Sequence, residues 1–156
     1  MEAVILIGIQ ASGKSTFYKQ RFFDTHVRIS CDLVRTRSRE ARLLQLCLDT
    51  RQPFAIDNTN PLADERAKYI VPAREAGFRV VGYFFRTEPR AAIARNNLRE
   101  GRARIPIPGL LGTYKKLQEP RASEGFHELH LVTLAPDGGF VVQPFLPADA
   151  PGDGSA

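Results

Sequence analysis

The sequence has few cysteines and no long apolar run, and both shortages limit the class of protein. No apolar run approaches the roughly 20 residues that a helix needs to span a bilayer. The apolar segment at residues 3–7 is too short for a signal peptide and follows no basic leader. We therefore expect no membrane association and no secretion. Cys31 and Cys47 have no metal-ligand spacing, which favours free, buried thiols in a reducing compartment such as the cytoplasm.

The sequence also lacks the patterns of several other functional classes. It has no separated Ser/His/Asp set, no zinc-ligand spacing and no aromatic RNA-recognition motif. Internal repeats and a dividing linker are absent too, so the 156 residues predict one domain at residues 1–146. The small, polar residues 147–156 are expected to form a flexible tail. Nothing in the sequence indicates an obligate protein partner.

What the sequence does contain is one complete phosphate-binding motif near its start. Residues 8–15 fit the pattern G-x-x-x-x-G-K-[ST] in full. A buried strand is expected before the motif at residues 3–7, and a helix after it at residues 14–23. In that setting the loop amides and the positive end of the helix dipole cradle a polyphosphate. The alternative interpretation is a chance glycine turn.

The motif assigns roles in the binding of ATP to individual residues. Lys14 is expected to reach the β and γ phosphates, and the Ser15 hydroxyl is expected to bind Mg²⁺. We predict that ATP is bound by Gly8, Gln10, Ala11, Ser12, Gly13, Lys14, Ser15 and Thr16.

Strand-like and helix-like segments alternate along the rest of the chain. Strand patterns fall at residues 27–30, 54–57, 78–85 and 128–134, and helical patterns at 33–49, 62–76, 88–100 and 110–117. Pro72 predicts a kink or a break in the helix at 62–76. Asp-Gly-Gly at 137–139 predicts a turn into a hairpin strand at 140–145. The fold class is therefore predicted to be α/β, with a central parallel sheet flanked by helices and a C-terminal antiparallel hairpin.

Two aspartates follow strands of this sheet, and they should lie near the phosphate loop because ligands bind beyond the carboxyl ends of parallel strands. Asp57 ends an apolar strand, where it would hold Mg²⁺ directly or through water; the alternative is an ordinary turn aspartate. Asp32 follows the second strand, where a carboxylate can accept the proton of a hydroxyl acceptor. Arg35, one helical turn later, would bind an anionic group on that acceptor. The alternative for this pair is a helix cap and a solvated arginine.

Arginines gather after the fourth predicted strand, in a chain whose net charge is +5. Arg95, Arg99 and Arg102 recur at helical spacing, so we expect them on one face of a lid at about residues 88–118. An arginine that closes over the phosphates can be worth about 10³ to 10⁵ in rate. A solvated helix face is the alternative. The net charge suggests a polyanionic partner, although solubility also accounts for it. The candidate catalytic residues are Lys14, Asp32, Arg95 and Arg99.

Several further segments resemble the kinase domain of the polynucleotide kinase/phosphatase family. They are residues 54–61 (Phe-Ala-Ile-Asp-Asn-Thr-Asn-Pro), 66–69 (Arg-Ala-Lys-Tyr), 94–97 (Ala-Arg-Asn-Asn) with 99–100 (Arg-Glu), and 124–126 (Glu-Gly-Phe). The spacing of Asp32 and Arg35 is similar to that of the phage and animal polynucleotide 5′-hydroxyl kinases. The likeness covers roughly residues 4–134.

This resemblance implies a P-loop kinase fold and an activity. The activity would be ATP-dependent phosphorylation of the 5′-OH end of DNA or RNA, in nucleic-acid repair, with Mg²⁺ as cofactor. The implied roles are the general base for Asp32, a grip on an acceptor phosphate for Arg35, the lid cation for Arg95 or Arg99, and contact with the acceptor nucleotide for Asn58 and Thr59.

The chain departs from the family at two points. Ser30 and Cys31 stand where the family usually has an asparagine-arginine pair, which bears on the acceptor contacts. The Asp-x-Asp-Gly phosphatase signature is absent, so no 3′-phosphatase activity is expected. Two other functions stay open from the sequence. One is a P-loop kinase of a small metabolite or antibiotic hydroxyl, and the other is a non-catalytic ATP-binding switch, which would not need Asp32.

Overall fold

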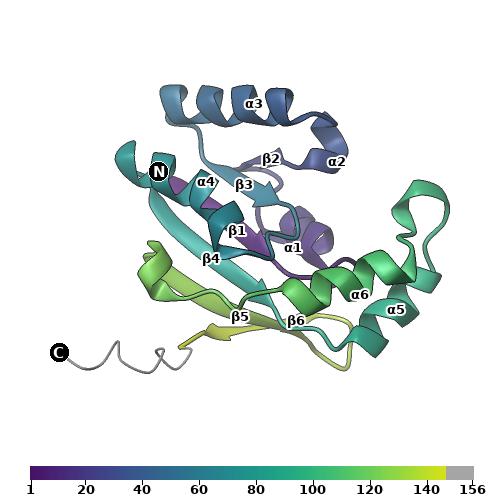
Figure 1. The fold of residues 1–156 in the computed structure, drawn as a ribbon. Helices are drawn as coiled ribbons and strands as arrows, with labels where there is room; N and C mark the ends of the chain where they lie inside the picture. Colours follow the sequence, from purple (N-terminus) through teal and green to yellow (C-terminus); the bar gives the residue numbers. More distant parts are fainter. Residues whose placement is uncertain (147–156) are drawn as a thin grey trace.

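The computed structural model describes residues 1–146, which form one sheet with helices on both of its faces (Figure 1). The strand order is β2-β3-β1-β4-β5-β6, and neighbours are parallel except for the antiparallel pair of β5 and β6. The strands are β1 (Glu2–Ile7), β2 (Val27–Ile29), β3 (Phe54–Asp57), β4 (Arg79–Phe85), β5 (Glu128–Leu134) and β6 (Phe140–Pro144). The predicted α/β sheet with its C-terminal hairpin is thus confirmed. The predicted tail, residues 147–156, lies outside the described residues.

The helices cover the sheet unequally. They are α1 (Lys14–Arg21), α2 (Cys31–Val34), α3 (Arg37–Thr50), α4 (Ala63–Glu75), α5 (Pro89–Asn97) and α6 (Ile107–Lys116), with short 3₁₀ turns η1 (Gly101–Ala103) and η2 (Ala122–Glu124). Side chains of α3 and α4 pack on one face of the sheet, and those of α1 pack on the other. Within the described part of the chain, no helix has the length and apolar character needed to cross a membrane.

The central strand explains where the site lies. Residues 3–7 of β1 are all 0% exposed, as expected of a parallel strand covered on both faces. In the sheet Leu6 pairs with Asp57 of β3, so both strands end at the same level. The loop that follows β1 is tied to the loop that follows β3, because Gly8 N–H donates to the Thr59 carbonyl at 3.0 Å. The carboxyl ends of these strands therefore bring residues 8–15 and Asp57 together.

The helix expected toward the end of residues 33–49 is confirmed as α3, but a separate short helix, α2, precedes it. α2 ends at Val34, and Arg35 adopts a left-handed conformation with φ of 75°. Thr36 then caps α3, its Oγ1 accepting the Arg39 N–H at 3.1 Å. Neither glycine nor proline marks this break, so helical periodicity alone could not locate it.

The segment predicted as a lid, residues 88–118, contains α5 and α6, which lie together beside the carboxyl ends of the strands (Figure 1). The predicted helix at 88–100 ends early, at Asn97. The preceding residue, Asn96, is fully buried and hydrogen-bonds both the N–H and the carbonyl of Ile105, which closes the loop between the two helices. Arg99 and Arg102 therefore do not share a helix face with Arg95, as the sequence predicted. In α4 the helix runs through Pro72 to Glu75, so of the predicted kink or break, the break does not occur.

Candidate active site

The phosphate-binding loop is shaped by two glycines. Gly13 has φ of 98° and begins α1, and a Cβ there would lie 3.0 Å from the Phe140 ring. A Cβ on Gly8 would lie 2.9 Å from the Cβ of Phe85 and 3.0 Å from Ser12 Oγ. Neither position accepts a side chain without a shift of the backbone or its neighbours. The loop amides thus keep the arrangement that binds an anion at a helix N-terminus.

Lys14 lies inside this loop and is buried. Its Nζ donates to the carbonyls of Gly8 and Ile9 at 2.8 Å each, and to Ser12 Oγ at 3.3 Å. Burial lowers the pKa of Lys14 to about 8, an effect that Asp57 opposes and Arg99 reinforces. The ammonium therefore gains from any anion that enters the loop, because an opposite charge favours its protonated form.

Ser15 and Asp57 form the pair that the sequence assigned to Mg²⁺. Ser15 Oγ donates to Asp57 Oδ2 at 2.9 Å. Among the described residues, no group of three or more His, Cys, Asp or Glu side chains could hold a metal ion alone. A magnesium ion in phosphoryl transfer needs only one or two protein oxygens, because phosphates and waters fill its other positions. The pair fits that requirement. Arg28, which the sequence did not single out, donates to the same oxygen of Asp57 at 2.7 Å.

A cavity of about 570 Å³ joins the phosphate loop to the predicted acceptor residues. Its lining includes Gln10, Ala11, Ser12, Gly13, Lys14, Ser15, Cys31, Asp32, Arg37, Asp57, Asn58, Thr59, Arg99 and Arg102. Asp32 is exposed in the first turn of α2 and borders this space. The general-base candidate, the lysine and the metal-side aspartate therefore share one cavity, which we call the first cavity.

Arg35 is not among the residues that line the first cavity, and its prediction as the acceptor arginine rested on an unbroken helix. It is exposed at the break between α2 and α3. Arg37, two residues later, lines the cavity instead. Its guanidinium is held by Glu40 of the next helical turn, through Nη1 and Oε1 at 3.0 Å. The sequence gave no role to Arg37 or Glu40, because both depend on where α3 begins.

A second cavity, of about 500 Å³, lies against the other side of the phosphate loop. It is lined by Ala11, Gly13, Thr16, Arg95, Arg99, Leu134, Ala135, Pro136, Gly138 and Phe140. Arg95 is tied to the loop, its Nη1 donating to the Ala11 carbonyl at 2.8 Å. Arg99 borders both cavities. The C-terminal hairpin, which had no assigned role, thus forms a wall next to residues 13–16.

The sheet, the glycine loop and the lid together define a kinase-like P-loop phosphotransferase fold. More particularly, the chain belongs to the AAA domain family, whose sequence pattern matches residues 4–109. One curated relative is the bifunctional polynucleotide phosphatase/kinase of Schizosaccharomyces pombe, 26% identical over 131 residues, which are 80% of this chain and 32% of that protein. The chain therefore spans about a third of the length of this relative.

Solved structures with the same fold are more diverse in sequence. A gluconokinase from Sinorhizobium meliloti aligns with a TM-score of 0.61 and 16% identity over 85% of this chain and 82% of that one. Chaetomium thermophilum Kti12, in complex with ADP-AlF3, aligns with a TM-score of 0.64 and 14% identity over 84% and 88%. An AvrRxo1-ORF1:-ORF2 complex with ATP aligns with a TM-score of 0.66 and 14% identity over 90% of this chain and 57% of that chain. At these identities the likeness concerns the fold.

Proposed function

We propose that this protein is an ATP- and Mg²⁺-dependent polynucleotide 5′-hydroxyl kinase, which transfers the γ-phosphate of ATP to the 5′-OH end of DNA or RNA in nucleic-acid repair. One observation carries the proposal. In the first cavity an exposed carboxylate, Asp32, lies with three arginines, Arg37, Arg99 and Arg102, that come from two separate segments. A hydroxyl acceptor needs a base, and a polyanionic acceptor needs cations along its path. The name of the fission-yeast relative agrees with this acceptor.

The residues of the first cavity supply the parts of the reaction. The 5′ oxygen attacks the γ-phosphorus, and its proton passes to the Asp32 carboxylate. The bond from the γ-phosphorus to the bridging oxygen breaks, and ADP leaves. Lys14 and Arg99 stabilise the charge on the transferred group. Mg²⁺, held by Ser15 and Asp57, would neutralise the charge of the phosphates.

The second cavity is the proposed place for the nucleoside of ATP. It shares Ala11, Gly13 and Arg99 with the first cavity but contains none of the acceptor-side residues, 31, 32, 37, 58 and 59. A donor whose phosphates lie in the loop can therefore extend its base toward the hairpin without meeting the acceptor. Apolar lining with a few polar groups is typical of such a site.

Labelled ATP tests the acceptor directly. The protein is incubated with ATP labelled at the γ-phosphate and Mg²⁺, together with 5′-OH DNA, 5′-OH RNA and a panel of small hydroxylated metabolites. We expect label on an oligonucleotide and not on the metabolites. The affinity of the protein for the oligonucleotide should fall by about 0.7 to 0.9 log units per phosphate contact for each log unit of salt concentration. Label on a metabolite alone would contradict the proposal.

A small-molecule kinase is the second candidate. The volume of the first cavity, about 570 Å³, lies within the range of small-molecule sites. The gluconokinase of Sinorhizobium meliloti and a sugar kinase from Janibacter share the fold, with TM-scores of 0.61 and 0.62. Such an enzyme would use Lys14, Ser15 and Asp32 in the same roles, and its acceptor would bind with little salt dependence. The metabolite arm of the same experiment identifies it.

A further inference from the structure

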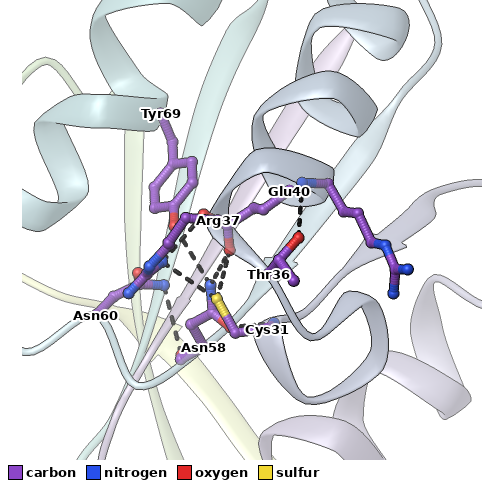
Figure 2. Close-up of polar contacts among 8 residues, drawn as sticks. Cys31, Thr36, Arg37, Glu40, Asn58, Asn60 and Tyr69 are labelled. Carbon is purple, nitrogen blue, oxygen red and sulfur yellow. Dashed lines mark hydrogen bonds and ion pairs between the residues drawn. The ribbon is translucent and has the colours of Figure 1, made fainter.

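A buried carboxylate lies behind one wall of the first cavity. Glu40, 6% exposed, accepts hydrogen bonds from four residues (Figure 2). The donors are Cys31 Sγ at 2.8 Å, Arg37 Nη1 at 3.0 Å, Asn58 Nδ2 at 3.0 Å and the Tyr69 hydroxyl at 2.8 Å. Because a carboxylate offers about four acceptor positions, this set uses its whole capacity.

Three of these four donors also line the first cavity. Cys31, Arg37 and Asn58 stand on its acceptor side with Asp32, whereas Tyr69 belongs to α4 and is not part of the lining. The Glu40 carboxylate therefore connects the acceptor wall to a helix that packs on the sheet. Partners in one hydrogen-bonded network fix one another's orientation.

The network also determines where Asp32 stands. α2 has only four residues, and Ser30 at its N-cap makes no side-chain capping bond. The cap comes instead from Asn58, whose Oδ1 accepts the Cys31 N–H at 2.9 Å. The bond from Asn58 Nδ2 to Glu40 keeps the amide turned in this direction. Asp32 is the next residue of the same turn, so its backbone position depends on Asn58 and, through it, on Glu40.

Charge adds a second effect. Burial alone would raise the pKa of Glu40, but the hydrogen bonds from Cys31, Tyr69 and Asn58 and the charge of Arg37 outweigh burial and lower it. Burial and the neighbouring Glu40 raise the pKa of the Cys31 thiol to about 11, so the thiol keeps its proton and remains a donor. A fixed anion thus holds Arg37, whose side chain is still 71% exposed.

We propose that Glu40 is a positioning residue of the acceptor site. It holds Arg37 at the wall of the first cavity, where the guanidinium binds an acceptor phosphate, and through Asn58 it holds the turn that carries Asp32. This inference rests on the proposed function and adds the residue that organises the acceptor side. Glu40 touches no reacting atom.

The kinetic test is Glu40→Gln, which removes the charge and keeps the size. With a 5′-OH oligonucleotide as acceptor, we expect the KM for the oligonucleotide to rise about 10-fold, since a charge-assisted contact is lost. The KM for ATP should stay within about twofold, because the phosphate loop is separate. Equal changes in both KM values, or wild-type kinetics, would overturn the proposal.

Tyr69→Phe is the matched control. It deletes one bond to the same carboxylate from the side away from the cavity. A purely structural role for Glu40 predicts that both variants lower Tm and leave the acceptor KM alone, whereas the positioning role predicts that only Glu40→Gln raises it. Should Glu40→Gln not fold, Arg37→Gln takes its place, because Arg37 is on the surface. A wild-type acceptor KM in Arg37→Gln would then overturn the proposal.

A thiol measurement separates this inference from the proposed function. Alkylation of Cys31 by iodoacetamide at about pH 8, followed by mass spectrometry, needs no acceptor. Loss of the Glu40 charge should lower the thiol pKa and speed alkylation about 10-fold, because the thiolate is the reactive form.

If the wild type phosphorylates no oligonucleotide, the proposed function fails. The kinetic comparison is then made with the metabolite that is labelled. An unchanged alkylation rate in Glu40→Gln refutes the control of this wall by Glu40 in either case.

Discussion

The two sides of the first cavity are built in different ways. The donor side is one continuous segment, residues 8–16, in which backbone groups and two glycines set the geometry. The acceptor side combines Asp32, Arg37 and Asn58. Arg37 and Asn58 are joined through the carboxylate of Glu40, and Asp32 follows Cys31, another donor to the same carboxylate. The donor side is therefore fixed by local conformation, whereas the acceptor side is fixed by tertiary contacts.

The largest expected effect breaks the donor side. Lys14→Ala removes the ammonium that lies in the phosphate loop. We expect kcat/KM to fall by about 10³ or more, because a buried charge that stabilises the transferred phosphoryl group is lost. The KM for ATP should rise as well. Steady-state kinetics with ATP and a saturating acceptor measure both values, and an unaffected rate would exclude the loop as the donor site.

Asp32→Asn breaks the acceptor side and leaves the donor side intact. Loss of the general base should reduce kcat by about 10² to 10⁴, while the affinity for ATP stays nearly unchanged. Isothermal titration with ATP provides the comparison, because within the described residues no hydrogen bond joins the Asp32 side chain to the phosphate loop, where Lys14 bonds Gly8, Ile9 and Ser12. Retained turnover in this variant would contradict the role of Asp32 as general base. A wild type that binds ATP but transfers no phosphate would instead favour the non-catalytic switch.

The same contrast explains what the sequence could predict. The phosphate loop was predictable because its pattern is contiguous and its geometry follows from glycine positions. The position of Asp57 was predictable because it ends an apolar strand, and in the structure it pairs with Leu6 of β1. Both predictions use only local sequence and the rule that ligands bind beyond the carboxyl ends of the strands.

The proposed acceptor arginine, Arg37, was not predictable in the same way. Arg35 has the expected spacing from Asp32, but its positive φ of 75° ends α2, and Arg35 does not line the first cavity. An L-residue seldom adopts such a conformation, and here nothing in the local sequence indicates it. The end of α5 was not predictable either. It depends on hydrogen bonds between the side chain of Asn96 and the backbone of Ile105, nine residues further on.

Part of the family resemblance turns out to concern folding rather than chemistry. Residues 66–69 and 124–126 are two of the segments on which the resemblance rests. In the structure Arg66 is fully buried and pairs with Glu124, through Nε to Oε1 at 2.7 Å and Nη2 to Oε2 at 3.0 Å. A Cβ on Gly125 would lie 2.8 Å from Ile70. These residues join α4 to η2, and they lie outside both cavities.

A matched pair of arginines sharpens the comparison at the acceptor side. Arg37→Ala should raise the KM for a 5′-OH oligonucleotide about 10-fold, whereas Arg35→Ala should change it by about twofold or less, because only Arg37 lines the first cavity. Initial rates over a range of oligonucleotide concentrations, at fixed saturating ATP, measure the effect. An equal or larger effect of Arg35→Ala would favour the acceptor arginine that the sequence spacing predicts.

The smallest expected effect is the dependence of stability on pH that Glu40 confers. The pKa of this carboxyl is lowered in the folded protein, so its contribution to stability is fully present above about pH 4.5, the ordinary value for glutamate, and is lost as the pH falls through the lowered pKa. The difference in unfolding free energy between wild type and Glu40→Gln should be on the order of 1 kcal/mol near pH 7 and should shrink below about pH 4. Denaturant unfolding at several pH values measures it.

Glu119→Gln is the control. Glu119 belongs to an exposed ion pair with Arg86, so its substitution should change the free energy of unfolding little at any pH. A difference for Glu40→Gln that stays constant down to the acid transition would mean that the carboxylate gains nothing from its four donors, and the acceptor wall would then need another anchor.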